Sequence, residues 1–190
     1  MNLPNQLTAS RFVFTAFFLC AIFWRFPLHD SLAVLFFGVA SFTDYLDGRI
    51  ARSRGLITNF GTLMDPLADK ILTCAAFIAL VERHKVEGWM AIIIVSRELA
   101  ITGLRLLAAS KQLVLAAEGY GKHKTISQMV AILALLIVDA SIEWGSWVET
   151  ALKPWFPCFA TAALWVTVLL TFSSGVLYLW RNRQLYLGDM

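Results

Sequence analysis

The sequence predicts an all-α polytopic membrane protein that forms a single domain over residues 1–190. First, 58% of the residues are hydrophobic and only 15% are charged, which is too apolar for an ordinary soluble domain. Second, apolar runs of about 20 residues, the length that crosses a bilayer as an α-helix, recur along the chain. Third, short polar segments separate these runs, so successive helices are expected to cross in opposite directions.

Six transmembrane helices are predicted, and a short interfacial segment precedes them. Residues 1–10 contain Pro4 and Asn5, which favour a turn, so we expect this segment to lie along the membrane surface. The six spans cover about residues 11–26, 31–48, 61–81, 89–109, 125–142 and 155–180. A basic loop over residues 49–59 joins the second span to the third, and a polar loop over residues 110–125 leads into the fifth.

The distribution of cations predicts how the chain is oriented. Six spans place both termini on one side, and only Arg25, Arg83, Lys85 and Lys153 fall in the loops of the opposite side. Most other cations lie near the termini or in the loops beside them: Arg11, Arg49, Arg52, Arg54, Lys70, Arg105, Lys111, Lys122, Lys124, Arg181 and Arg183. By the positive-inside rule this side is the cytoplasm. We therefore expect a multi-pass plasma (inner) membrane protein with both termini and its active site on the cytoplasmic side.

Four aspartates stand at the cytoplasmic ends of the second and third predicted spans. Asp44 and Asp47 are three residues apart, and Asp65 and Asp69 are four apart, so each pair shares one helical face. Ionised carboxylates near lipid cost several kcal/mol to desolvate unless a cation pairs with them. Carboxylate oxygens are hard ligands that suit Mg²⁺, Mn²⁺ or Ca²⁺, and two such ions about 4 Å apart stabilise a phosphoryl displacement.

The residues between the aspartate pairs fit a phosphate-binding site. Gly48 and Gly61 leave room for a nucleotide or a neighbouring helix to come close, and Arg52 offers a guanidinium fork suited to phosphate. The structural alternative is a set of buried carboxylates that serve no chemistry. Four nearby cations would then neutralise them: Arg49, Arg52, Arg54 and Lys70.

The acidic segment resembles the signature of the CDP-alcohol phosphotransferases. The string D-x-x-D-G-x-x-A-R-x8-G-x-x-x-D-x-x-x-D is formed here by Asp44, Asp47, Gly48, Ala51, Arg52, Gly61, Asp65 and Asp69. The resemblance implies an integral membrane enzyme in which an alcohol attacks the diphosphate of a CDP-activated donor and CMP leaves. It also implies two divalent cations, Mg²⁺ or Mn²⁺, bound by the four aspartates, with Asp69 also the catalytic base, and a homodimer.

The fourth predicted span and the loop after it carry more cations than their one carboxylate can pair. Arg97 and Arg105 are eight residues apart, close to two helical turns, so they share a face near Thr102. Lys122 and Lys124 follow in the loop. An acceptor alcohol that carries a phosphate would supply the missing negative charge. The alternative is that Arg97 pairs with Glu98 or an aspartate while the lysines face the cytosol.

Further segments resemble those of the phosphatidylglycerophosphate synthases within this family. They are RELAITGLRLL at 97–107, GKHKT at 121–125 and the opening LPNQLTASR, which contains Asn5, Thr8 and Arg11. His123 departs from the apolar residue expected between the two lysines. The resemblance implies that Asn5, Thr8, Gly48, Ala51, Arg52 and Gly61 contact the CDP donor, and that Arg97, Thr102, Arg105, Lys122 and Lys124 bind the acceptor phosphate.

The resulting hypothesis is transfer of the phosphatidyl group from CDP-diacylglycerol to sn-glycerol 3-phosphate, which gives phosphatidylglycerophosphate and CMP. Phosphatidylglycerol, inositol phosphate or serine are alternative acceptors for the same chemistry. A cation transporter is a further alternative, although it gives no role to Gly48, Ala51, Arg52 and Gly61. The membrane lipid supplies the donor, and no nucleic-acid partner is expected.

Overall fold

The computed structural model describes residues 3–54, 59–110, 120–183 and 185. Within these ranges the chain is helical and contains no strand. Six long helices are α1 (Leu3–Phe23), α2 (His29–Arg54), α3 (Asn59–Glu82), α4 (Gly88–Ser110), α5 (Tyr120–Glu143) and α7 (Phe156–Arg181). The short helix α6 (Ser146–Leu152) lies between α5 and α7. The prediction of an all-α protein is confirmed for the described residues.

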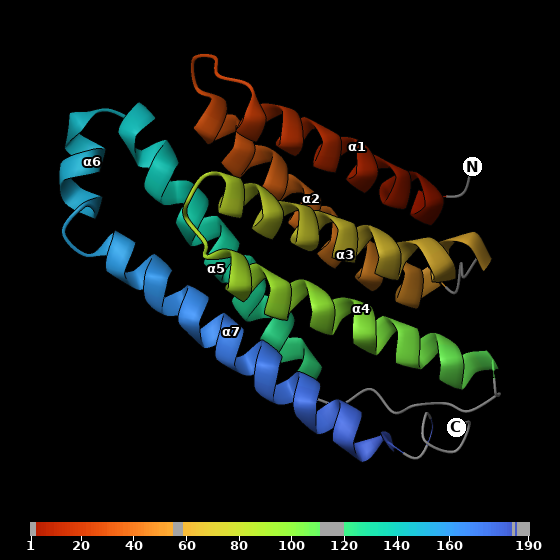
Figure 1. Ribbon diagram of the computed structural model, residues 1–190. Coiled ribbons are helices and arrows are strands. Elements are labelled where there is room, and N and C mark those ends of the chain that lie inside the picture. The colour runs from red at the N-terminus through yellow and green to blue at the C-terminus, as the bar shows by residue number, and fades with distance from the viewer. Residues whose placement is uncertain (1–2, 55–58, 111–119, 184, 186–190) are drawn as a thin grey trace.

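The six long helices form a bundle in which successive helices run in opposite directions (Figure 1). Each contains 21 to 26 residues and is therefore roughly 32 to 39 Å long, enough to cross a hydrocarbon core. Helix α1 packs on α2 and α3, α2 packs on α5, and α7 packs on both α5 and α4. The last helix thus lies beside the helix that carries Arg97 and Arg105.

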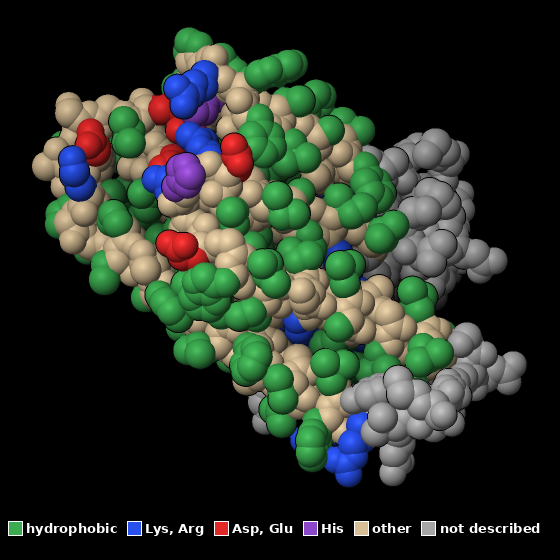
Figure 2. Space-filling model, in the orientation of Figure 1, with side chains coloured by type: hydrophobic (Ala, Val, Ile, Leu, Met, Phe, Trp, Pro, Cys, Tyr) green, Lys and Arg blue, Asp and Glu red, His purple; other side chains and the backbone are tan. Residues whose placement is uncertain are grey.

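The interior combines large aromatic side chains with many alanines. Phe18, Phe37 and Phe77 are fully buried, and Ala33, Ala40, Ala76 and Ala79 let neighbouring helices approach closely. Large hydrophobic side chains also cover much of the outside, and the acidic side chains visible on one face gather at one end (Figure 2). An apolar exterior of this kind suits a surface that faces lipid rather than water.

Two helices in the described ranges are long and apolar enough to cross a membrane by length and composition. They are Lys124–Glu143 within α5 and Phe156–Arg181. The apolar parts of α1 and α2 are shorter, Ser10–Phe23 and His29–Thr43. The number of spans therefore remains a prediction.

Three predicted boundaries were wrong, each because a helix continues beyond its apolar part. Helix α1 covers Leu3–Phe23, so residues 3–10 do not form a separate segment with a turn. Pro4 sits in its first turn, where the missing N–H costs no helical hydrogen bond. Helix α2 continues through residues 49–54, and α5 begins at Tyr120, so Lys122 and Lys124 are helical. Hydropathy marks the apolar part of a helix, whereas Arg and Lys are themselves good helix formers.

Helix α6 was also missed. It lies between the last two predicted spans, where no helix was predicted. Its seven residues are too few to give a clear hydrophobic period, so the sequence held little signal for it.

Candidate functional site

The aspartate motif lies at one end of the bundle. Asp44 and Asp47 are in the last part of α2, and Asp65 and Asp69 are in the first half of α3. Because α2 and α3 run in opposite directions, both pairs lie near the connection between them (Figure 1). The side chains of the four aspartates lie outside the described structure, which gives only their positions along α2 and α3. The motif end below means the end at which α2 ends and α3 begins.

Most of the other predicted site residues also belong to helices at the motif end. Asn5 and Thr8 are in the first half of α1, whose start lies beside the end of α2 (Figure 1). Gly48, Ala51 and Arg52 are in α2, Gly61 is in α3, and Lys122 is in α5. For these residues, too, the side-chain surroundings fall outside the description.

A buried carboxylate joins α4 to α5 next to the motif. Glu98 is only 6% exposed and forms ion pairs with Lys124 and with Arg97, whose Nη1 lies 3.5 Å from Oε1. Gln128 donates its Nε2–H to the same oxygen at 3.3 Å. We call Arg97, Glu98, Lys124 and Gln128 the Glu98 network. It holds two of the predicted acceptor-binding cations on one carboxylate.

This arrangement partly matches the structural alternative considered for these cations. Arg97 does pair with Glu98, as that alternative proposed. Lys124, in contrast, is only 3% exposed and is paired, so the view that it faces the cytosol was wrong. Lysines in loops are mostly exposed, but Lys124 lies in α5, is buried, and receives its counter-charge from Glu98 of α4.

A second contact connects α3, which carries Asp65 and Asp69, to α4. Lys70, which follows Asp69, donates a hydrogen bond to the hydroxyl of Thr102. Thr102 in turn donates to the backbone carbonyl of Glu98 at 2.6 Å. The residue after the predicted base is therefore in direct contact with the predicted acceptor segment.

The two arginines of α4 reach across to α7. Arg97 donates from Nη2 to the hydroxyl of Ser174 at 3.4 Å. Arg105 donates from Nε to the hydroxyl of Tyr178 at 3.5 Å, and its guanidinium carbon lies 5.8 Å from the centre of that ring. A groove of about 310 Å³ opens between α4 and α7, and Arg97 is the charged residue that lines it.

Sequence reasoning had considered Lys70 only as a counter-charge for the aspartates, and it had assigned no role to Gln128, Ser174 or Tyr178. One signal could have located the α7 positions. Thr167, Thr171, Ser174 and Tyr178 recur every three or four residues in an otherwise apolar helix and form a polar stripe on one face. Thr167, Thr171 and Tyr178 are buried in the structure.

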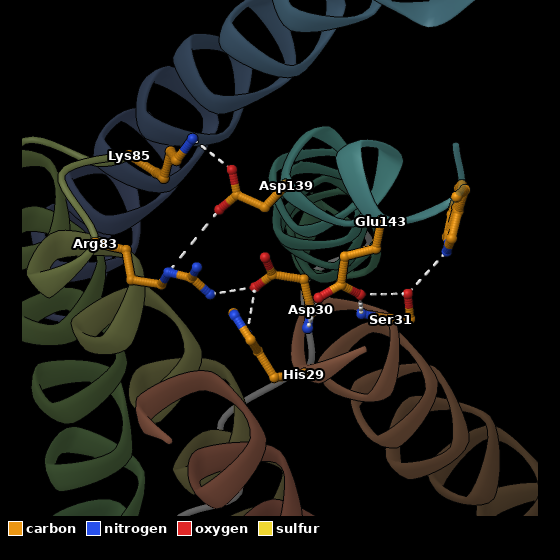
Figure 3. Close-up of polar contacts among 8 residues, drawn as sticks. His29, Asp30, Ser31, Arg83, Lys85, Asp139 and Glu143 are labelled. Atoms are coloured by element: carbon orange, nitrogen blue, oxygen red, sulfur yellow. Dashed lines mark hydrogen bonds and ion pairs between the residues drawn. The ribbon is translucent and has the colours of Figure 1, made fainter. Parts of the chain in front are cut away.

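The opposite end of the bundle carries a second polar cluster (Figure 3). Ligand atoms of His29, Asp30 and Glu143 lie within 4.8 Å of one another, a spacing that could suit a metal ion. Protein groups already occupy these carboxylates. Asp30 pairs with Arg83, and Glu143 accepts the backbone N–H groups of Asp30 and Ser31 at 3.1 and 2.9 Å.

This second cluster functions as a cap for α2. Helix α2 begins at His29 directly after Leu28, which has no side-chain acceptor for the first N–H groups. The carboxylate of Glu143 satisfies two of them and also accepts the Ser31 hydroxyl at 2.6 Å. Asp139 joins the cluster through Lys85 at 2.5 Å. The capping cluster below comprises His29, Asp30, Ser31, Arg83, Lys85, Asp139 and Glu143.

Comparison with known proteins identifies the family of the chain. A sequence model of the family described as CDP-alcohol phosphatidyltransferase matches residues 1–173, which include the whole aspartate motif. The chain belongs to the CDP-alcohol phosphatidyltransferase family. CDP-alcohol phosphatidyltransferases are membrane-embedded enzymes that typically use a divalent metal ion. The resemblance inferred from the motif is therefore confirmed.

Curated CDP-alcohol phosphatidyltransferases match nearly the full length of the chain. A protein of Bacillus subtilis is 40% identical over 193 residues, which cover 95% of each chain. Proteins of Rickettsia bellii and Haemophilus influenzae are 32% and 33% identical over 93% and 94% of this chain and 93% and 91% of their own. Each is named CDP-diacylglycerol–glycerol-3-phosphate 3-phosphatidyltransferase.

Proposed function

We propose that this chain transfers the phosphatidyl group from CDP-diacylglycerol to sn-glycerol 3-phosphate, which forms phosphatidylglycerophosphate and CMP. The observation that carries the proposal is the contact between α3 and the cation-rich segment of α4, through Lys70 and Thr102. It joins a motif suited to a diphosphate donor to cations suited to a phosphorylated acceptor. The names of the curated relatives support the same substrates.

In this proposal Asp44, Asp47, Asp65 and Asp69 bind two divalent cations. Four carboxylates on two adjacent helices form an all-oxygen ligand set, which suits Mg²⁺ or Mn²⁺ and not a softer metal. The bound ions supply neutralisation of the charge that develops on the diphosphate as CMP leaves. Around the nucleotide, Asn5, Thr8, Gly48, Ala51, Arg52 and Gly61 hold the donor, while its acyl chains stay in the bilayer.

The acceptor phosphate is bound by Arg97, Thr102, Arg105, Lys122 and Lys124. Asp69 accepts the proton of the acceptor's primary hydroxyl as that oxygen attacks the phosphorus. Lys70 supports this role for its neighbour, because its hydrogen bond to Thr102 keeps the base within reach of the acceptor segment. Binding the phosphate at a fixed distance from the base orients the hydroxyl for attack.

The orientation in the membrane follows from the same proposal. Six spans place the motif end and both termini in the cytoplasm, where glycerol phosphate is available. Five exposed tryptophans lie in or beside the connections at the other end, as expected where that end meets a membrane interface. They are Trp24, Trp89, Trp144, Trp147 and Trp155. A homodimer completes the proposed assembly.

An assay with labelled CDP-diacylglycerol and a panel of acceptors tests the proposal. The purified protein in detergent is given glycerol 3-phosphate, phosphatidylglycerol, inositol phosphate or serine, with and without Mg²⁺ or Mn²⁺. We expect metal-dependent release of CMP with glycerol 3-phosphate as the preferred acceptor. Release with a different acceptor alone would reject the assigned substrate, and cation flux from liposomes without CMP release would reject the reaction.

A further inference from the structure

The last two turns of α7 contact both arginines that the proposed acceptor site depends on. We infer that Ser174, Gly175 and Tyr178 are positioning residues that fix the guanidinium groups of Arg97 and Arg105 for an acceptor phosphate. The inference rests on the proposed function and deepens it. The family match ends at residue 173, so these three residues lie just beyond it.

Arg97 is held by a close approach to the backbone of α7. A Cβ atom added at Gly175 would lie 2.8 Å from Cγ of Arg97, closer than two carbon atoms can pack. The stem of Arg97 therefore passes directly over this glycine, and a larger residue would move the whole side chain. Beyond the glycine, the guanidinium contacts Ser174 on one side and Glu98 on the other.

The surroundings of Arg97 leave it few other places to bind. Most side chains that line the groove between α4 and α7 accept no hydrogen bond, among them Ile101, Phe172 and Val176. Ser96 is the other polar residue that lines it. The side chain of Arg97 is only 15% exposed, so little solvent reaches it. The orientation of an arginine side chain in an apolar groove is set by its few hydrogen-bond and ion-pair partners.

Arg105 is held by a buried aromatic ring. Tyr178 is only 4% exposed, and its hydroxyl accepts the Nε–H of Arg105 while the ring lies beneath the guanidinium. This contact uses Nε and leaves both Nη groups of Arg105 for an anion. Oriented in this way, the planar group can present two parallel donors to phosphate oxygens.

The two arginines act on each other through their charges. Each guanidinium lies within range of the electrostatic field of the other, since they occupy one face of α4 two turns apart. Like charges separate if their side chains are free to move. Contacts with α7 offset this repulsion before substrate arrives, so that less ordering is needed when a doubly charged phosphate binds.

Two substitutions on α7 test the inference, each with a matched control. Gly175→Ala adds a methyl group against Arg97, whereas Gly38→Ala adds one to α2 where nothing lies within 4 Å. Tyr178→Phe removes one hydroxyl and keeps the ring, whereas Leu177→Ala shortens an exposed side chain on the neighbouring face. Steady-state KM values for glycerol 3-phosphate and for CDP-diacylglycerol are measured together with kcat.

We expect Gly175→Ala and Tyr178→Phe to raise KM for glycerol 3-phosphate about 3- to 10-fold, the effect of one lost or misaligned hydrogen bond. KM for the donor should stay within about twofold of wild type, as should every parameter of the two controls. Competitive inhibition by inorganic phosphate should weaken in parallel with the rise in KM for glycerol 3-phosphate. An equal rise in both KM values, or no change in either, overturns the inference.

The inference and the proposed function can fail separately. The acceptor panel with wild-type protein decides the substrate, and the variants are then assayed with whichever phosphorylated acceptor is used. Preference for an acceptor that carries no phosphate overturns both. Thermal unfolding in detergent accompanies each variant, and Tyr178→Phe keeps the buried ring, so a change confined to the acceptor KM cannot come from loss of the fold.

Discussion

The two polar clusters of this bundle are built from the same residue types but differ in charge balance. In the capping cluster, Asp30 and Asp139 pair with Arg83 and Lys85, and Glu143 caps a helix. In the Glu98 network one carboxylate contacts both Arg97 and Lys124. Carboxylates that pair with cations of neighbouring helices or cap a helix stabilise a structure, whereas two cations on one carboxylate also fit an anionic ligand. The comparison predicts that substitutions in the capping cluster change stability alone, whereas those near the Glu98 network also change the binding of phosphate or substrate.

The largest effect is expected at the motif. Asp69→Asn keeps the shape of the side chain but removes the proposed base, so kcat should fall about 10³-fold, which corresponds to about 4 kcal/mol of transition-state stabilisation. The thermal midpoint and donor binding should be retained, as measured by unfolding in detergent and by CDP-diacylglycerol titration. Glu149→Gln, at an exposed pair with Lys153, is the matched control. Undiminished turnover in Asp69→Asn would rule out the base assignment.

Loss of the shared carboxylate should produce the next largest effect. Glu98→Gln leaves Arg97 and Lys124 without the negative charge between them, which should lower the free energy of unfolding by about 3 kcal/mol. Because an anion can replace that charge, millimolar inorganic phosphate should restore part of the thermal midpoint. The same phosphate should raise the thermal midpoint of a capping-cluster variant no more than it raises that of wild type. Equal responses at the two ends would remove the proposed difference between them.

Arg105 should affect acceptor binding directly. Arg105→Ala removes a charged donor to the proposed phosphate and should raise KM for glycerol 3-phosphate about 10- to 100-fold. KM for CDP-diacylglycerol should change much less. Arg183→Ala removes an exposed arginine that lies over Trp180 and serves as the control for net charge. A similar rise for both substrates would count against an acceptor site on α4.

The smallest effect is expected in the capping cluster. Glu143→Gln weakens the charge-assisted hydrogen bonds to the start of α2, so the free energy of unfolding should fall by about 1 to 2 kcal/mol. Neither KM nor kcat should change when measured well below the unfolding temperature. A shift in acceptor KM for this variant would show that the two ends are coupled.

The sequence by itself determined the features that depend on short-range spacing. Apolar runs predicted an all-α chain, and the positions of the two aspartate pairs in these runs assigned them to two successive helices. The intervals of three and four residues indicated that each pair shares one helical face. The match to the family signature was equally local, since it lies within residues 44–69. Such features are readable because a helix repeats every 3.6 residues whatever surrounds it.

Only the tertiary structure decided which helices exchange polar contacts. Glu98 meets Gln128 thirty residues later, Arg105 meets Tyr178, and Glu143 caps a helix that begins more than a hundred residues before it. Hydropathy cannot predict these partners, because a face that packs on another helix and a face that contacts lipid are equally apolar. Helix packing brought α7 against α4, and that contact turned an unassigned polar stripe into the support for the two arginines.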